Sequence, residues 1–291
     1  MGPVFSQVMG NTIHDIHVRR LFTGAEMAGI KFHGAVDTAI SDNHIYRTTR
    51  GIWLDWMTQG TRVTRNLLHD NGPSEDLFVE VNHGPFLVDN NILLSGNGIL
   101  VNSQGGAYVH NLIAGRVRVH VGERRLTPHL EAHATNVAGL APNLSGDERF
   151  YNNLLANEGL AGYDRAVLPV FMGGNIFLKG AEPSKHESKP LVLADSDPAL
   201  ALVEQPDGLY LQMTVEKAIT QQQCPLVTTD LLGQAKTPDL SYEQPDGTPY
   251  RLGTDYFGKK RNATNPTAGP FESPGIGSLK LKVWPRNHRS Q

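Results

Sequence analysis

The sequence predicts an all-β protein with a right-handed parallel β-helix over residues 1–180. Three observations predict this fold class. Glycine and proline supply 30 and 18 of the 291 residues, whereas charged residues make up only 19%. Short alternating apolar segments recur along the first two thirds of the chain, and asparagine recurs beside them at a nearly constant interval. The composition argues against a helix bundle, and short strands at a fixed period are typical of a solenoid of β-coils.

An asparagine beside a pair of apolar residues marks each predicted coil. The markers are Asn43, Asn66, Asn91, Asn111, Asn153 and Asn175, with Asn11 as an earlier member. The gaps from the first marker to the last are 23, 25, 20, 42 and 22 residues. Because 42 is close to two units, we expect one coil between residues 112 and 150 to have lost its marker. We interpret the column as structural, since asparagine tolerates left-handed turns and its amide can bond to the like residue one coil away.

Two short strands are predicted for each coil. The first precedes the asparagine, as in TAIS (38–41), TRVT (61–64) and PFLV (85–88). The second follows about ten residues later, as in GIWLDW (51–56) and LFVEV (77–81). A sandwich also contains many short strands, but it would not repeat an asparagine slot at this period.

The last part of the chain, residues 181–291, differs in pattern. Two PDG turns, at 206–208 and 245–247, punctuate it, and it ends in the alternating segment PGIGSLKLKVW (274–284). We expect an irregular, β-rich extension packed on the β-helix.

Aligning the second strand of successive coils exposes one column of side chains. The segments IKFH (30–33), IWLD (52–55), LFVE (77–80) and ILVN (99–102) align at offsets of 22, 25 and 22 residues. The alternation then predicts an inward set of Ile30, Phe32, Ile52, Leu54, Leu77, Val79, Ile99 and Val101. It predicts an outward column of His33, Asp55, Glu80 and Asn102, with Lys31, Trp53, Phe78 and Leu100 beside it.

Asp55 and Glu80 are the candidate catalytic residues. Neighbouring parallel strands lie about 4.8 Å apart, so their carboxyl groups are expected at roughly that separation. Retaining glycosidases need about 5–5.5 Å between nucleophile and acid/base, and inverting enzymes need about 6.5–9.5 Å. The spacing therefore favours a retaining hydrolase. Trp53 and Phe78 are expected to form an apolar wall for a sugar ring.

Several other functions are disfavoured. The net charge of −3, with basic residues spread along the chain, indicates no nucleic-acid partner. No apolar run suits a membrane span, and no signal peptide is visible, which fits a cytoplasmic protein. The single cysteine, Cys224, excludes an internal disulfide framework. We expect no cofactor and no metal site, since the i, i+4 spacing of His129 and His133 is a weak signal.

Two long segments of the sequence are similar to the catalytic coils of glycoside hydrolase family 120 β-xylosidases. They are AGIKFHGAVDTAISDNHIYRTTRGIWLDWMTQGTRVTRNLLHDN and DLFVEVNHGPFLVDNNILLS. The motifs DYFG (255–258), GPFE (269–272) and LKVW (281–284) also resemble the C-terminal part of that family.

The resemblance implies a retaining enzyme that releases xylose from the non-reducing ends of xylo-oligosaccharides. The family's nucleophile corresponds to Asp55, its acid/base to Glu80, and a glutamate near its sugar site to Glu26. As neighbours of the column, we add His33, Trp53, Asn82 and His83 to the candidate substrate-binding residues.

Members of that family are about twice as long, with earlier coils and an inserted β-sandwich. We therefore expect the N-terminal part of the family fold to be missing from this sequence. An uncapped coil end exposes unpaired backbone, which makes a homo-oligomer a further expectation.

Two alternatives stay open at this point. One is a non-catalytic β-helix fragment or a carbohydrate-binding module. The other is a polysaccharide lyase of the same fold, for which Lys31 and Arg50 could supply cationic groups near the carboxylates.

Overall fold

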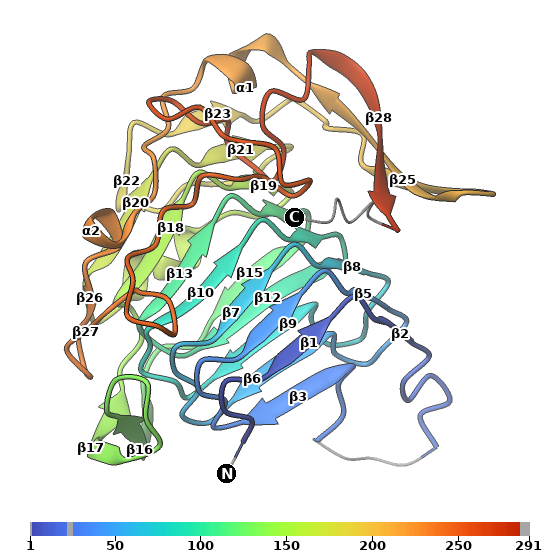
Figure 1. Ribbon diagram of the computed structural model, residues 1–291. Helices are drawn as coiled ribbons and strands as arrows, with labels where there is room; N and C mark the ends of the chain where they lie inside the picture. Colours follow the sequence, from blue (N-terminus) through green and yellow to red (C-terminus); the bar gives the residue numbers. More distant parts are fainter. Residues whose placement is uncertain (1, 22–25, 286–291) are drawn as a thin grey trace.

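The computed structural model describes residues 2–21 and 26–285 and shows a parallel β-helix (Figure 1). Each coil contributes strands to two or three parallel sheets, so the predicted fold class is confirmed. Sheet 1 contains, in order, β1 (Gln7–Met9), β4 (Ala39–Ser41), β7 (Arg62–Thr64), β10 (Phe86–Asp89), β13 (Gly106–Val109), β18 (Glu148–Tyr151), β20 (Val170–Gly173) and β22 (Glu187–Ser188). Sheet 2 contains β2 (Thr12–His14), β5 (His44–Tyr46), β8 (Leu67–His69), β11 (Ile92–Leu93), β14 (Leu112–Ile113), β19 (Leu154–Ala156), β21 (Ile176–Leu178) and β23 (Leu191–Leu193). Sheet 3, the shortest, contains β3 (Ile30–His33), β6 (Ile52–Asp55), β9 (Leu77–Glu80), β12 (Asn97–Asn102) and β15 (Arg116–Val119).

The core lies inside the coils and is formed by alternate residues of all three sheets. The inward set predicted for sheet 3 belongs to it, with Phe32 packed at its margin and the other seven residues buried. Side chains such as Ile40 of sheet 1, Ile45 of sheet 2 and Leu54 of sheet 3 are fully buried within this core. Burying alternate apolar positions in every coil stabilises the stack, at roughly 25 cal/mol for each Å² of apolar surface removed from water.

The asparagine column forms a continuous hydrogen-bonded ladder. Each side-chain amide donates to the side-chain carbonyl of the asparagine in the next coil, at 2.9–3.0 Å. The ladder begins at Asn11, as expected, and it ends on the buried carboxylate of Glu187. There, Asn175 Nδ2 donates to Glu187 Oε2 at 2.6 Å. The structural interpretation of the column is therefore confirmed.

Left-handed backbone does occur beside the ladder, but not at the asparagines to which we had attributed it. The residue before the ladder asparagine carries the positive φ, for example 57° at Asp42, 56° at Arg65 and 55° at His110. The asparagines are therefore needed for their amide groups, which both donate and accept, rather than for their turn conformation.

The wide gap in the asparagine spacing does not hide an extra coil. Asn111 donates directly to Asn153, and β13 pairs directly with β18. The additional residues form the antiparallel hairpin of β16 (Glu123–Leu130) and β17 (Val137–Asn143), which projects from the solenoid (Figure 1). The prediction of a coil without a marker was wrong, because spacing alone does not distinguish a second coil from an inserted hairpin of similar length.

The chain beyond the solenoid is mostly irregular, with short elements laid along the coils. Its largest sheet is antiparallel, in the order β24 (Ala201–Gln205), β25 (Gly208–Val215) and β28 (Gly277–Trp284). The smaller elements of this part are α1 (Lys217–Gln221), α2 (Thr229–Leu232), β26 (Gln234–Ala235) and β27 (Leu240–Ser241), whereas η1 (Ala161–Arg165) lies within the solenoid, between β19 and β20. Because β22 and β23 extend sheets 1 and 2, solenoid strands continue past residue 180, where we expected the boundary.

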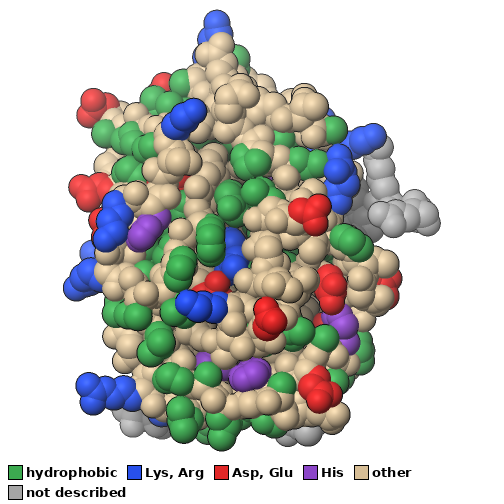
Figure 2. Space-filling model, turned by 90° about the vertical axis from the view of Figure 1, so that its left-hand side faces the viewer, with side chains coloured by type: hydrophobic (Ala, Val, Ile, Leu, Met, Phe, Trp, Pro, Cys, Tyr) green, Lys and Arg blue, Asp and Glu red, His purple; other side chains and the backbone are tan. Residues whose placement is uncertain are grey.

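The C-terminal segment, residues 194–285, passes from α1 along the solenoid to β27, near the hairpin, and then returns to β28 (Figure 1). Leu211, Met213 and Val283, in the sheet of β24, β25 and β28, pack in one cluster with Leu67 and Ile92 of sheet 2. On the face that carries α2, β26 and the hairpin, acidic and basic side chains are scattered among hydrophobic ones (Figure 2). In the described residues, no helix has the length and apolar character needed to cross a membrane.

Candidate active site

The outward column of sheet 3 has the register that the sequence predicts. Asp55 pairs directly with Glu80, and these residues end strands β6 and β9. His33 pairs with Asp55 on one side, and Asn102 pairs with Glu80 on the other. The two carboxylates therefore project from neighbouring strands, at the same level along the sheet.

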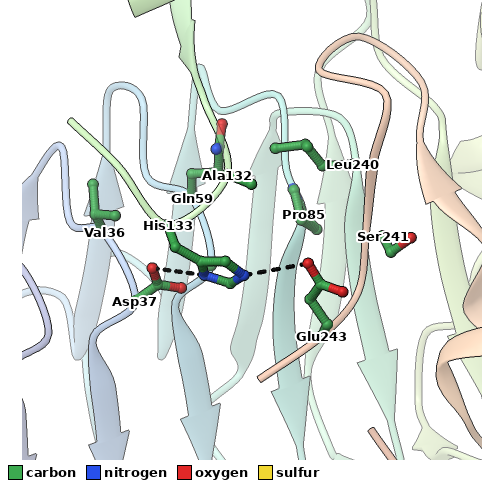
Figure 3. A pocket seen from close by; sticks show the side chains of 10 residues that line it. Val36, Asp37, Gln59, Pro85, Ala132, His133, Leu240, Ser241 and Glu243 are labelled. Carbon is green, nitrogen blue, oxygen red and sulfur yellow. Dashed lines mark hydrogen bonds and ion pairs between the residues drawn. The ribbon is translucent and has the colours of Figure 1, made fainter. Parts of the chain in front are cut away.

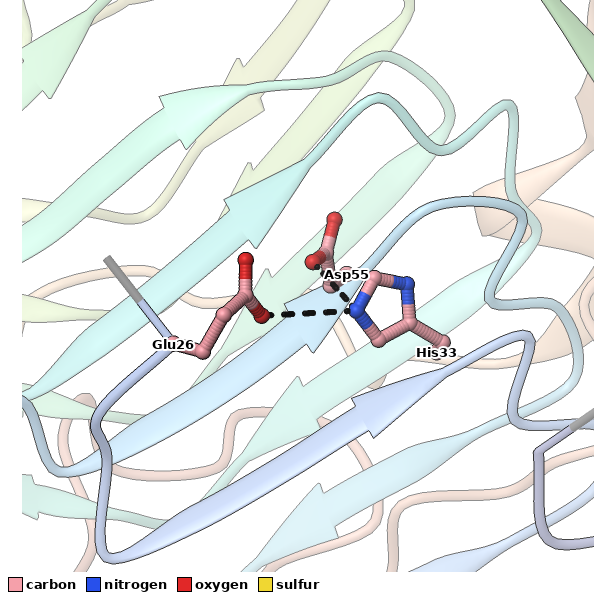
Figure 4. Close-up of side chains that lie close together, drawn as sticks. All are labelled: Glu26, His33 and Asp55. Carbon is pink, nitrogen blue, oxygen red and sulfur yellow. Dashed lines mark ion pairs between the residues drawn. The ribbon is translucent and has the colours of Figure 1, made fainter. Parts of the chain in front are cut away.

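Asp55 is held by two basic groups. Its Oδ2 lies 2.9 Å from Lys31 Nζ and 3.0 Å from His33 Nε2. Glu26 joins from the segment before β3, where its carboxylate contacts Lys31 and lies 3.6 Å from His33 Nε2 (Figure 4). The Asp55 side chain is only 9% exposed, so its carboxylate is surrounded by these partners rather than by water.

The side chains of Glu26, His33 and Asp55 also have the residue types of a metal site. One ligand atom from each lies within 4.8 Å of the other two. However, the ammonium group of Lys31 contacts both carboxylates and already supplies a positive charge between them. A divalent cation at this point would face that ammonium at close range. We therefore interpret the cluster as an ion-pair network around Asp55.

Glu80 has different partners. Its Oε2 accepts a hydrogen bond from the indole nitrogen of Trp53 at 3.1 Å, and its Oε1 lies 3.4 Å from Arg125 of strand β16. Arg125 also pairs with Glu123 at 3.0 Å. The sequence interpretation missed Arg125, because it assigned this segment to a coil instead of a hairpin whose base lies beside Glu80.

The expected apolar wall is covered by cationic side chains. Trp53 and Phe78 are 4% and 7% exposed, and their ring centroids lie 5.3 Å apart. Lys31 Nζ lies 3.5 Å from the centroid of the Trp53 ring, and the guanidinium of Arg50 lies over both rings at 4.3 and 4.6 Å. Arg50 is in turn paired with the buried Glu75. With the rings covered in this way, the group that Trp53 presents to the carboxylate column is its indole N–H.

Asn82 and His83 do not join the column. Asn82 is fully buried, where its amide accepts from Thr58 N at 2.7 Å and donates to Leu54 O at 3.0 Å. The His83 ring is buried between Thr127 O and the Gln104 amide, at 3.1 and 2.8 Å. Burial lowers the pKa of His83 to about 4. Both side chains are committed to neighbouring coils and the hairpin, so their geometry favours a structural role.

The i, i+4 spacing of His129 and His133, which was a weak signal for a metal site, does not reflect a helix. His129 lies in strand β16 and His133 lies in the turn of the hairpin, so the pair shares no helical face.

Residues 2–113 match a family model described as a right-handed β-helix region. The match agrees with the three parallel sheets and defines the fold as a right-handed parallel β-helix.

Among solved structures, the chain is similar to XylC, whose structure was determined in complex with xylose. The sequences are 37% identical, and the structures superimpose with a TM-score of 0.91 over 97% of this chain and 48% of the XylC chain. The chain therefore spans about half the length of XylC. No curated protein sequence matches it significantly.

Proposed function

We propose that this protein is a retaining glycoside hydrolase that releases xylose from the non-reducing ends of xylo-oligosaccharides. The observation that carries the proposal is the direct pairing of Asp55 with Glu80 on neighbouring strands. Strands about 4.8 Å apart suit the carboxyl separation of about 5–5.5 Å that a retaining mechanism needs. The similarity to XylC in complex with xylose supports a xylose-based substrate.

The two carboxylates take different roles in this proposal. Asp55 attacks the anomeric carbon and forms an ester bond to the sugar, while the bond from that carbon to the leaving oxygen breaks. Glu80 gives its proton to the leaving oxygen in the same step. In the second step, Glu80 takes a proton from water, the water oxygen bonds to the anomeric carbon, and the ester to Asp55 breaks. Xylose leaves with its original anomeric configuration.

The neighbours of the two carboxylates support these roles. Lys31 and His33 both contact Oδ2 of Asp55, so we assign Oδ1 as the attacking oxygen. A cation on Oδ2 also stabilises the charge that returns to Asp55 when the ester breaks. Trp53 and Arg125 contact opposite oxygens of Glu80, which fixes the plane of the carboxyl group. We assign Glu26, which projects into solvent beside His33 with 68% of its side chain exposed, to sugar binding.

The test is hydrolysis of p-nitrophenyl β-xyloside with product configuration followed by NMR. We expect Asp55→Ala to lose activity by about 10⁴-fold or more and to recover part of it with azide, as an inverted xylosyl azide. Exchange of the exposed Asp195 for alanine is the matched control and should leave the rate unchanged. Formation of inverted xylose by the unmodified protein would exclude the retaining assignment.

Two further measurements separate the alternatives. A carbohydrate-binding module would bind xylobiose in titration calorimetry but release no xylose. A lyase would yield unsaturated products that absorb in the near ultraviolet. Either outcome with a folded protein would overturn the hydrolase proposal.

A further inference from the structure

The hairpin of β16 and β17 connects the candidate active site with a second cluster of ionisable groups. At its base, Arg125 reaches Glu80. Along its length, Gln59 of the solenoid bonds to both the N–H and the carbonyl of Leu130, at 3.1 and 3.0 Å. These anchors are polar, so hydrogen bonds and charges contribute to the docked position of the hairpin.

At the tip of the hairpin, His133 lies between two carboxylates from distant parts of the chain. Its Nδ1 is 3.0 Å from Asp37 Oδ2, in the turn between β3 and β4, and its Nε2 is 3.2 Å from Glu243 Oε1, just after β27 (Figure 3). A neutral imidazole has only one N–H, so it can donate to only one of these partners. While both carboxylates are ionised, both contacts are favourable only when the ring is an imidazolium cation.

The side chains around His133 are acidic or uncharged. The Asp37 side chain is 1% exposed, and among the described residues its second oxygen has no hydrogen-bond partner. The charged groups that act on His133 are Asp37 from the solenoid, and Glu243 and Asp246 from the C-terminal segment. The other residues that line this pocket are uncharged, among them Gln59, Pro85 and Ser241. All three charged neighbours are acidic, so the pocket is built for a cation.

We infer that His133 is a positioning residue: as a cation it fastens the tip of the hairpin to the solenoid and to the C-terminal segment, and through the hairpin it keeps Arg125 on Glu80. The effect on catalysis rests on the proposed function, whereas the fastening of the hairpin does not.

The ionisation of His133 and that of Asp37 determine how the contacts of the hairpin tip depend on pH. Burial acts to lower the pKa of His133, but the hydrogen bonds and charges of Asp37 and Glu243 outweigh it and raise that pKa above its usual value of 6.5. The His133 ring is therefore fully cationic below pH 6.5, and while Asp37 and Glu243 are ionised the imidazolium contacts are lost only as the pH rises through the higher folded-state pKa of His133. Burial also raises the pKa of Asp37, so deprotonated His133 leaves a poorly solvated carboxylate behind.

Hydrogen exchange followed by mass spectrometry tests the inference without substrate. In the unmodified protein, we expect exchange in residues 123–143, corrected for its intrinsic pH dependence, to become about tenfold faster between pH 6 and pH 9. In His133→Gln we expect fast exchange at both pH values. The exposed His120, at the base of the hairpin, gives the control variant His120→Gln, which should respond like the unmodified protein.

Glu243→Gln is the second variant, and it serves if the first fails to fold. It removes one of the two carboxylates and should reduce the pH response while it leaves the contact with Asp37. An equal response in His133→Gln and in the unmodified protein, or no response in the latter, would overturn the inference.

Steady-state kinetics then tests the link to Glu80. We expect His133→Gln to lower kcat about threefold to tenfold with a smaller change in KM, because positioning of an acid/base acts on the chemical step. An unchanged kcat with a pH-dependent hairpin would refute the link. A protein without xylosidase activity but with the expected exchange would refute the proposed function and leave the fastening of the hairpin intact.

Discussion

Replacing Glu187 with glutamine should stabilise the protein at alkaline pH. Glu187 accepts from the last amide of the asparagine ladder and is 8% exposed. Burial raises its pKa from 4.5 to about 7, against the opposing effect of the bonds from Asn175. The folded state therefore binds the proton more tightly than the unfolded state does, and stability falls as the pH rises from about 4.5 to 7.

The size of the effect follows from the same quantities. Each tenfold change in proton affinity is worth about 1.4 kcal/mol, so ionised Glu187 costs about 3 kcal/mol well above pH 7. Glutamine removes this cost, but its NH₂ group faces the Asn175 backbone N–H, which lies 3.4 Å from Oε1 in the present structure. The loss of that acceptor costs about 1 kcal/mol. The net gain expected for Glu187→Gln is about 2 kcal/mol at pH 8.5.

Urea unfolding followed by circular dichroism at pH 5.0 and pH 8.5 measures this difference. At pH 5.0 the carboxyl group is mostly protonated, so the variant should be no more stable than the unmodified protein. Glu182→Gln, at an exposed position nearby, changes the net charge equally and controls for it. If Glu187→Gln fails to raise the urea midpoint at pH 8.5, the amide ladder stabilises the ionised carboxylate and the reasoning is wrong.

Three further substitutions test the ladder and the site. Asn91→Ala should lower the free energy of unfolding by about 4 kcal/mol or more in urea titrations, because it leaves several buried donors and acceptors without partners. The control Asn136→Ala, at an exposed position, should cost less than about 0.5 kcal/mol. Similar losses for both variants would contradict a structural ladder. Trp53→Phe keeps an aromatic ring but removes the indole N–H that bonds to Glu80. We expect xylosidase activity to fall about tenfold, together with some loss of stability because the smaller ring leaves a cavity. Full activity would show that this bond is dispensable. Lys31→Met removes the cation from the proposed nucleophile and should lower kcat about a hundredfold, with partial activity in Lys31→Arg; a rate near that of the unmodified protein would exclude a role in the reaction.

The register of the candidate site could be predicted from the sequence because two simple periods determine it. Side chains alternate faces along each strand, and the apolar residues of IWLD and LFVE leave one choice of inward face. Once those faces are aligned, Asp55 and Glu80 must be neighbours, and the structure pairs them. The identity of the ladder residues followed from the coil period in the same way.

Other features could not be predicted, because they depend on contacts between segments whose relative position cannot be deduced from the coil period. Arg125 reaches Glu80 only because an inserted hairpin brings it beside the end of β9. The covering of Trp53 depends on Arg50, whose position is fixed by an ion pair with Glu75. The sequence neighbourhood of Glu80 suggested a site role for Asn82, yet the turn after β9 directs that amide to the backbone of the preceding coil.

The asparagine ladder also makes the fold tolerant of insertions. The step from Asn111 to Asn153 closes with the same amide contact as the steps of 20 to 25 residues, although it encloses a complete hairpin. A coil can therefore stay in register through its ladder amide and its short strands when the chain between them is lengthened by a hairpin. New loops could therefore be introduced where the hairpin of β16 and β17 is inserted, near the carboxylates, without a change to the β-helix itself.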